Sequence, residues 1–153
     1  MDEPAPASRS DSDLDPDMNM QQTETLRALA VAAAQHAYAP YSRLRVGAAL
    51  RSVAGGVYRG CNVENGAYPL GSCAERGAIA AAMQAEGPSF RLAEIAVAAF
   101  SADDTALPVS PCGGCRQVLV EFGPEAAVSF HQPDGSWAYV SADALLPWRF
   151  VLP

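Results

Sequence analysis

Residues 92–100 read LAEIAVAAF, a nearly unbroken apolar run of strand length. A strand that is apolar at successive positions, and not only at every second one, is typical of a sheet covered on both faces. This segment therefore predicts a strand buried between two layers of other structure.

The chain on either side of this run alternates between apolar segments of strand length and Ala-rich or Leu-rich segments of helical composition. The predicted strands lie at 45–53, 57–63, 92–100, 126–131 and 137–140. The predicted helices lie at 23–36, with Thr23 or Thr25 as the N-cap, at 73–85 and at 111–123, with a short helical turn at 142–146. Strands interleaved with helices indicate the α/β fold class, with a single mixed β-sheet layered with helices.

The N-terminal segment has a different composition. Residues 1–22 (MDEPAPASRSDSDLDPDMNMQQ) combine Pro, Ser and Asp with almost no large apolar side chain, so they cannot bury enough surface to offset chain entropy. We expect a disordered acidic N-terminal tail over 1–22. The remaining residues, 23–153, suffice for one ordinary core and predict a single domain.

The distribution of charge argues against nucleic acid as a partner. The formal net charge is -7, but residues 1–22 hold six acids and one Arg (-5), while the rest holds eleven acids and nine Arg (-2). The predicted domain lacks the basic excess that phosphate contacts require, so we expect a small-molecule substrate. All ten basic residues are Arg, which excludes Schiff-base chemistry on Lys and a phosphate-binding P-loop Lys.

We expect a cytoplasmic protein that does not associate with membranes. No stretch approaches the roughly 20 apolar residues of a membrane span, and the N-terminus is acidic where a secretory signal would be basic and then apolar. Four Cys in such a chain indicate metal ligands or catalytic thiols before disulfides.

Three of these thiols have the spacing of a metal site. Cys112 and Cys115 stand at i and i+3 in PCGGC, where they share one face of a helix start, and Cys73 opens another predicted helix. Three protein ligands leave the fourth tetrahedral position open for water or substrate, which distinguishes a catalytic Zn²⁺ site from a closed structural one. Helix N-termini also stabilise thiolates.

Glu75 and Arg76 follow Cys73 directly in the chain. We expect Glu75 to lie beside water at the open position, as the general acid/base, in a site dry enough to raise its pKa. Arg76 can donate to a thiolate and offset the negative charge of three thiolates on Zn²⁺, or it can be an exposed helix residue paired with a surface acid. The pairing of CAE with PCxxC is the signature of zinc deaminases.

With these motifs the sequence resembles the cytidine deaminases of the small, homotetrameric type. The resemblance is carried by AYAPYSRLRVGAAL at 37–50, GCNVENGAYPLGSCAERGA at 60–78, SPCGGCRQVL at 110–119 and LLPWRF at 145–150. It implies that 23–153 form a three-layer α/β/α cytidine deaminase domain. The implied activity is zinc-dependent hydrolytic deamination of cytidine and deoxycytidine to uridine and deoxyuridine, in pyrimidine salvage, by a homotetramer with shared active sites.

The resemblance also implies roles in substrate binding. Asn62 and Glu64 correspond to the pair that binds the ribose, and two residues apart on a strand they face the same way. The main-chain N–H of Ala74 corresponds to a donor to the pyrimidine carbonyl. Phe150 corresponds to a C-terminal aromatic that reaches a neighbouring subunit's active site.

Other positions carry weaker expectations. Many members of the family have Phe where this chain has Leu44, which can still form an apolar wall; the lost aromatic geometry is worth about 0.5–1.5 kcal/mol and affects base affinity, not reaction type. Tyr68 could line the pocket or pack elsewhere. Cys61 is expected in the core, and His36 and His131 have no partner at ligand spacing.

Two alternatives to a cytidine deaminase remain from the sequence. One is a deaminase of a non-nucleoside cytosine compound such as blasticidin S, against which the pair Asn62 and Glu64 argues. The other is a non-catalytic zinc or thiol module: a closed Cys₄ site using Cys61 would indicate a structural module, and reversible oxidation of Cys112 and Cys115 a redox protein.

Overall fold

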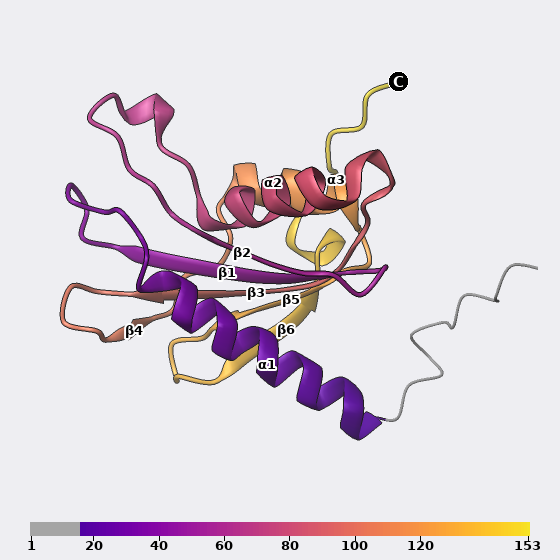
Figure 1. Ribbon diagram of the computed structural model, residues 1–153, viewed down its shortest axis with the longest axis horizontal. Helices are drawn as coiled ribbons and strands as arrows, with labels where there is room; N and C mark the ends of the chain where they lie inside the picture. The colour runs from indigo at the N-terminus through magenta and orange to yellow at the C-terminus, as the bar shows by residue number, and fades with distance from the viewer. Residues whose placement is uncertain (1–15) are drawn as a thin grey trace, which may run out of the picture.

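A twisted mixed sheet separates two helical layers in this protein (Figure 1). The computed structural model describes residues 16–153, so the disorder expected for 1–15 lies outside the described residues. The helices are α1 (Pro16–Ala34), α2 (Ala74–Glu86) and α3 (Gly113–Phe122), with single 3₁₀ turns η2 (Tyr68–Leu70), η3 (Gly87–Ser89) and η4 (Asp143–Leu145). The strands are β1 (Arg45–Ser52), β2 (Val57–Cys61), β3 (Leu92–Phe100), β4 (Ala106–Leu107), β5 (Ala127–His131) and β6 (Trp137–Ser141).

The order of the strands places β3 at the centre of the sheet. The order is β2-β1-β3-β5-β6, and β4 pairs with the end of β3. β3 and β5 run parallel while the other neighbouring strands are antiparallel, so the single mixed sheet predicted from the sequence is confirmed. α2 and α3 cover one face and α1 covers the other, which gives the three-layer α/β/α arrangement (Figure 1).

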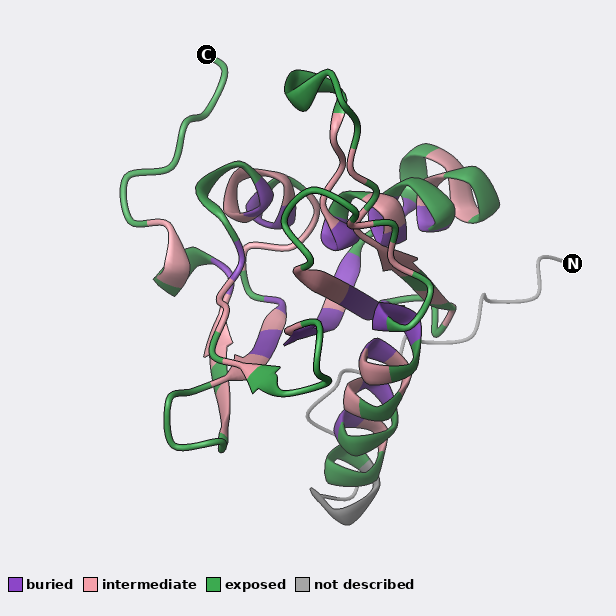
Figure 2. Ribbon diagram, turned by 90° about the vertical axis from the view of Figure 1, so that its left-hand side faces the viewer, coloured by how far each residue is buried: buried purple, intermediate pink, exposed green. Residues whose placement is uncertain are grey.

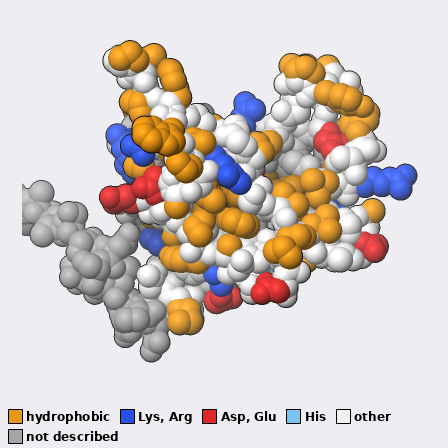
Figure 3. All heavy atoms as spheres, turned by 180° about the vertical axis from the view of Figure 1, so that it is seen from behind, with side chains coloured by type: hydrophobic (Ala, Val, Ile, Leu, Met, Phe, Trp, Pro, Cys, Tyr) orange, Lys and Arg blue, Asp and Glu red, His pale blue; other side chains and the backbone are white. Residues whose placement is uncertain are grey.

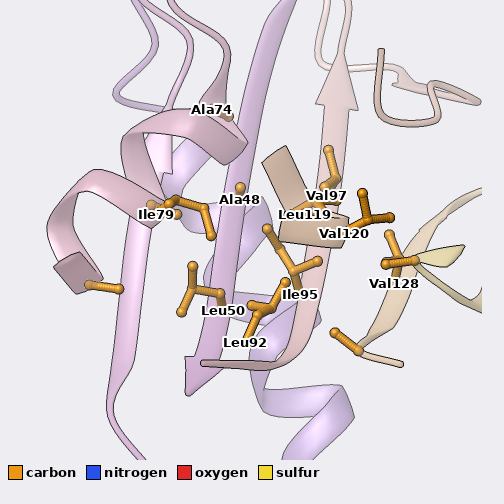
Figure 4. Packing of buried hydrophobic residues seen from close by; sticks show 14 of the residues in the cluster. Ala48, Leu50, Ala74, Ile79, Leu92, Ile95, Val97, Leu119, Val120 and Val128 are labelled. Carbon is orange, nitrogen blue, oxygen red and sulfur yellow. The ribbon is translucent and has the colours of Figure 1, made fainter. Parts of the chain in front are cut away.

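The buried side chains of β3 point alternately into two cores. Ile95 and Val97 pack with residues of α2 and α3 (Figure 4), whereas Ala96 and Ala98 pack with residues of α1. The continuous apolar run at 92–100 is therefore explained, because both faces of this strand are covered. Figure 2 shows the same pattern, with burial concentrated in the sheet and in the sides of the helices that face it.

The first helix begins earlier than the sequence predicted. α1 begins at Pro16, so 16–22 are helical and Thr23 lies inside the helix instead of capping it. Thr23 is buried and its hydroxyl donates to Glu94 of β3 at 2.6 Å, while Arg51 of β1 pairs with the same carboxylate at 3.2 Å. This contact fixes the helix against the sheet, and a helix anchored there continues through the polar residues before it.

Gly60 of β2 allows the first turn of α2 to lie directly on the sheet. A Cβ atom at this position would be 2.3 Å from the carbonyl oxygen of Ala74 and 2.4 Å from the nitrogen of Ala78. Gly47 of β1 has the same role under α1, where a Cβ would be 2.0 Å from a main-chain oxygen. Because α2 begins at Ala74, this contact at Gly60 also sets the position of Cys73 and Glu75.

We therefore expect Gly60→Ala to destabilise the protein. The added methyl group meets backbone atoms that cannot move without displacing α2, and overpacking of this kind typically costs about 1–3 kcal/mol. Urea unfolding measures the change. Gly113→Ala is the matched control, since a Cβ at Gly113 meets no atom within 4 Å, and its midpoint should stay close to that of the unchanged protein. Equal midpoints for all three proteins would contradict the close approach at Gly60.

Candidate functional site

Two helix starts bring three thiols together at one end of the sheet. Cys73 is the N-cap residue of α2 and Cys112 the N-cap residue of α3, and their Sγ atoms are 3.9 Å apart. The Cys115 N–H donates to Cys112 Sγ at 3.5 Å. All three Sγ atoms lie within 4.8 Å of one another, so the spacing in the sequence does correspond to one cluster.

The chemistry of this cluster fits a zinc ion. Tetrahedral Zn–S bonds of about 2.3 Å place sulfur atoms about 3.8 Å apart, near the separation of Cys73 and Cys112. Burial raises the pKa of the Cys73 and Cys115 thiols, and the nearby Glu75 carboxyl raises both further. Three thiolates beside a carboxylate therefore require a cation, and thiolate donors select soft or borderline metals such as zinc.

Glu75 is a buried carboxyl next to the thiols. It lies in the first turn of α2 with only 4% of its surface exposed, and burial raises the pKa of its carboxyl group. The dry environment expected for this residue is thus present. A raised pKa makes the carboxylate a stronger base that can later return the proton as an acid, which is the requirement for a general acid/base.

A cavity of about 340 Å³ opens onto this cluster, a size suited to a small ligand. Its apolar wall comes from Leu44, Val46, Val97 and Val109. Of the residues proposed from the sequence, the lining includes Leu44, Asn62, Glu64, Tyr68, Cys73, Ala74, Glu75 and Cys112. Among the described residues that line it, none is cationic.

The side-chain amide of Asn62 holds the start of β1. Its Oδ1 accepts from Val46 N at 2.7 Å, and its Nδ2 donates to Leu44 O at 2.8 Å. Sequence reasoning missed this structural role, because the partners lie 16 and 18 residues away in the chain. The Oδ1 of Asn62 can accept one further hydrogen bond and its Nδ2 can donate one further hydrogen bond.

Glu64 accepts hydrogen bonds from the turn that precedes β1. Its Oε2 accepts from Tyr41 N at 2.8 Å and from Ser42 N at 3.2 Å, and the Ser42 hydroxyl donates to Oε1. The same hydroxyl accepts from Leu44 N at 3.0 Å. The hydrogen bond from Ser42 lowers the pKa of Glu64, so this carboxylate is ionised at neutral pH. Ser42 was not identified from the sequence, where only its place before a strand could have indicated a turn.

Three proposed residues lie outside the cluster or on its rim. Tyr68 is 76% exposed in η2 and packs edge-on against Tyr41 with ring centroids 6.0 Å apart. Phe150 is 67% exposed and does not line the cavity of its own chain. Arg76 is exposed, and its guanidinium forms no hydrogen bond or ion pair with any side chain described in 19–153, so neither its predicted bond to a thiolate nor the alternative pairing with a surface acid is seen there.

The fourth thiol and the two histidines belong elsewhere. Cys61 is half-buried and lines a separate groove with His36, away from the three-thiol cluster. A closed site of four cysteines is therefore not formed by the described residues. The ring of His131 packs against Trp137, with ring centroids 4.0 Å apart, and lies edge-on to Phe100 at 6.4 Å.

Known proteins match this chain over most of its length. The family model described as "Cytidine and deoxycytidylate deaminase zinc-binding region" matches residues 20–131. A cytidine deaminase of Sporosarcina psychrophila is 50% identical over 90 residues, which are 59% of this chain and 62% of that protein. A cytidine deaminase of Halalkalibacterium halodurans is 43% identical over 120 residues, which are 78% of this chain and 86% of that protein.

Solved structures agree with these matches. The crystal structure of cytidine deaminase from Burkholderia pseudomallei superposes with a TM-score of 0.72 at 44% identity, covering 83% of this chain and 98% of that one. The chain belongs to the zinc-binding family of cytidine and deoxycytidylate deaminases. The relatives named above are all cytidine deaminases, so the resemblance stated from the motifs is confirmed.

The geometry of the thiols generates a prediction about metal content. Purified protein should contain about one zinc ion per chain, and replacing Cys73, Cys112 or Cys115 with Ser should remove most of it, because two thiolates hold Zn²⁺ far less tightly than three. Elemental analysis measures the zinc content.

Cys61→Ser is the control for these variants, since Cys61 lies outside the cluster. It should keep the full zinc content. Full zinc in Cys73→Ser, or loss of zinc in Cys61→Ser, would show that the ligand set is different.

Proposed function

We propose that this chain is a zinc-dependent cytidine deaminase that hydrolyses cytidine and deoxycytidine to uridine and deoxyuridine with release of ammonia, a reaction of pyrimidine salvage. The observation that supports this most directly is the position of buried Glu75 beside three clustered thiols on the wall of a small-molecule cavity. Membership of the deaminase family supports the same reaction.

In the proposed mechanism, Cys73, Cys112 and Cys115 would hold Zn²⁺ as thiolates. Zinc bound there supplies Lewis-acid activation of the water that attacks C4 of the base. Glu75 would take one proton from this water and deliver it to N3, then take the second proton from the hydroxyl group added at C4 and deliver it to the amine, which leaves as ammonia while the C4 carbonyl forms. Because Glu75 works first as base and then as acid, the raised pKa of its carboxyl group suits both steps.

The cavity offers matching contacts for the two halves of a nucleoside. Leu44 and the neighbouring valines form an apolar wall for the base. The N–H of Ala74 belongs to the first residue of α2 and has no partner within the helix, so it is free to donate to the pyrimidine carbonyl. Asn62 and Glu64 stand ready for the hydroxyls of the sugar.

The charge of the cavity favours a nucleoside over a nucleotide. The family includes deoxycytidylate deaminases, whose substrate carries a phosphate. The described lining of this cavity has no Arg, the chain has no Lys, and Glu64 is ionised. A 5′-phosphate would meet a carboxylate without a compensating cation, which disfavours its binding.

We propose a homotetramer with shared active sites. Trp148, Phe150, Val151 and Leu152 are exposed in the C-terminal segment, as are Tyr68 and Leu70 in η2. Both segments project from the molecule, and Figure 3 shows apolar side chains over both and across the surface between them. Apolar surface of this extent is typical of an interface, and a second copy would bring its Phe150 to the cavity rim.

We place this enzyme in the cytoplasm. All four cysteines are free thiols, which suits a reducing compartment. Among the described helices, none combines the length and apolarity that crossing a membrane requires. The near balance of charge in 23–153 gives no basic surface for nucleic acid.

Glu75→Gln tests the activity and its mechanism together. The substitution keeps size and polarity but removes proton transfer, so zinc should stay while kcat for cytidine falls by at least about 10⁴-fold, the upper end for general acid/base catalysis. The ultraviolet change from cytidine to uridine measures turnover. An unchanged protein that leaves both cytidine and deoxycytidine intact would refute the proposed function, and a variant with more than about a tenth of the original kcat would refute the role of Glu75.

Phe150→Ala tests the shared site. Because Phe150 lies outside its own cavity, its loss should raise KM for cytidine only if a neighbouring subunit uses it, and zinc content should not change. Val151→Ala is a matched control for lost apolar surface near the chain end. Light scattering gives the assembly state, and a fully active monomer at assay concentration would rule the shared site out.

A further inference from the structure

Arg116 forms an unusual set of hydrogen bonds at the start of α3. It follows Cys115 directly, and its Nε donates to Pro111 O at 2.8 Å. Its Nη2 donates to Ser110 Oγ at 3.0 Å, and its Nη1 donates to Leu145 O at 3.0 Å. One guanidinium group therefore connects the turn that carries Cys112 with the end of η4.

A positively charged side chain at the start of α3 is an unfavourable placement that needs an explanation. A cation in the first turn of a helix is disfavoured by the helix dipole, and Arg116 is partly buried. Its donors are spread over three nitrogens of a planar group, so they reach separated acceptors that the single nitrogen of a Lys cannot all reach. The three hydrogen bonds offset the unfavourable position, so they are the reason for an arginine here.

The turn that Arg116 holds contains one thiol and precedes another. Pro111 is fully buried and Cys112 follows it, while the Arg116 N–H donates to Cys112 O at 2.9 Å. The main chain of Arg116 thus bonds Cys112 itself, and its side chain bonds the residue before Cys112. A rotation of the 110–112 segment would move Cys112 Sγ relative to Cys115, and the guanidinium opposes that rotation.

The hydrogen bond from Arg116 to Leu145 holds the start of the C-terminal segment. Arg116 holds Leu145 O, and the neighbouring Gln117 donates from Nε2 to Phe150 O at 3.1 Å. Between these two anchors Trp148 has a φ of 59° and is fully exposed. Two adjacent residues of α3 therefore bracket the segment that contains Trp148.

We propose that Arg116 is a positioning residue that keeps the 110–112 turn in metal-binding geometry and links it to the C-terminal segment at Leu145. The proposal rests on the zinc site of the proposed function, and it assigns Arg116 no contact with substrate. Loss of the guanidinium should loosen the turn and the C-terminal segment together.

The first test measures the zinc affinity of Arg116→Met by competition with a chromogenic chelator. Outer partners of metal ligands typically contribute about 10- to 100-fold in affinity, so the variant should bind zinc more weakly by that factor. The zinc affinity of Arg116→Lys should lie between that of Arg116→Met and that of the unchanged protein, because Lys keeps the charge but can bond fewer of the three acceptors. If Arg116→Met does not fold, the zinc affinity of Arg116→Lys tests the proposal by itself.

Arg91→Met is the matched control. Arg91 also donates to two carbonyl oxygens, Pro88 O at 3.2 Å and Phe90 O at 2.7 Å, but none of its contacts involves the thiol cluster. This variant should keep the zinc affinity of the unchanged protein. A general loss of packing would weaken both variants alike and would overturn the proposal.

The second test follows the C-terminal segment by trypsin cleavage after Arg149, between the two anchors. Arg116→Met should be cleaved faster than Arg91→Met in the zinc-loaded state. Zinc affinity within twofold of the original in both Arg116 variants, or unchanged cleavage, would overturn the inference. Zinc binding and cleavage are measured without turnover. A chain that fails to deaminate cytidine would therefore refute the proposed function, while the role of Arg116 would still be decided by zinc affinity and cleavage.

Discussion

Two helix N-termini converge on one small region of this protein, and the rest of the site depends on which groups balance the partial positive charge of these helix ends. α2 starts after Cys73 and α3 after Cys112, so the positive ends of two helix dipoles lie close together. Like ends repel unless anionic groups stand between them. Thiolates and an ionised Glu75 are such groups, and a divalent cation bound among them would balance their excess charge. Gly60 permits this arrangement, because it lets α2 lie directly on β2.

The two carboxylates of the cavity have opposite environments and therefore suit opposite tasks. Burial raises the pKa of Glu75, whereas the hydroxyl of Ser42 and two main-chain N–H groups lower the pKa of the half-buried Glu64. A carboxyl that exchanges protons belongs beside the reacting atoms, and one that stays ionised can anchor hydroxyl groups. Division of labour by environment is a general way in which one residue type serves two functions.

Local sequence patterns predicted those parts of the fold that depend on neighbours in the chain. β3 follows from an unbroken apolar run, and the thiol cluster follows from spacing at two helix starts. The contact that joins Thr23 of α1 to Glu94 of β3 did not follow, because these two residues are 71 positions apart in the chain. The hydrogen bonds of Asn62 and Ser42 were missed for the same reason: their partners become neighbours only when β1 and β2 pair.

The three thiols differ in burial, and this difference gives the proposed zinc site an order of assembly. Cys115 is buried, Cys73 is intermediate and Cys112 is exposed. A competing ligand from solution reaches the site at Cys112 first, so exchange of the ion would begin there and end at Cys115. Loading would follow the reverse order, so the bond to the exposed Cys112 would form last. Because the three thiols are unevenly buried, exchange of the ion with solution would be controlled at Cys112.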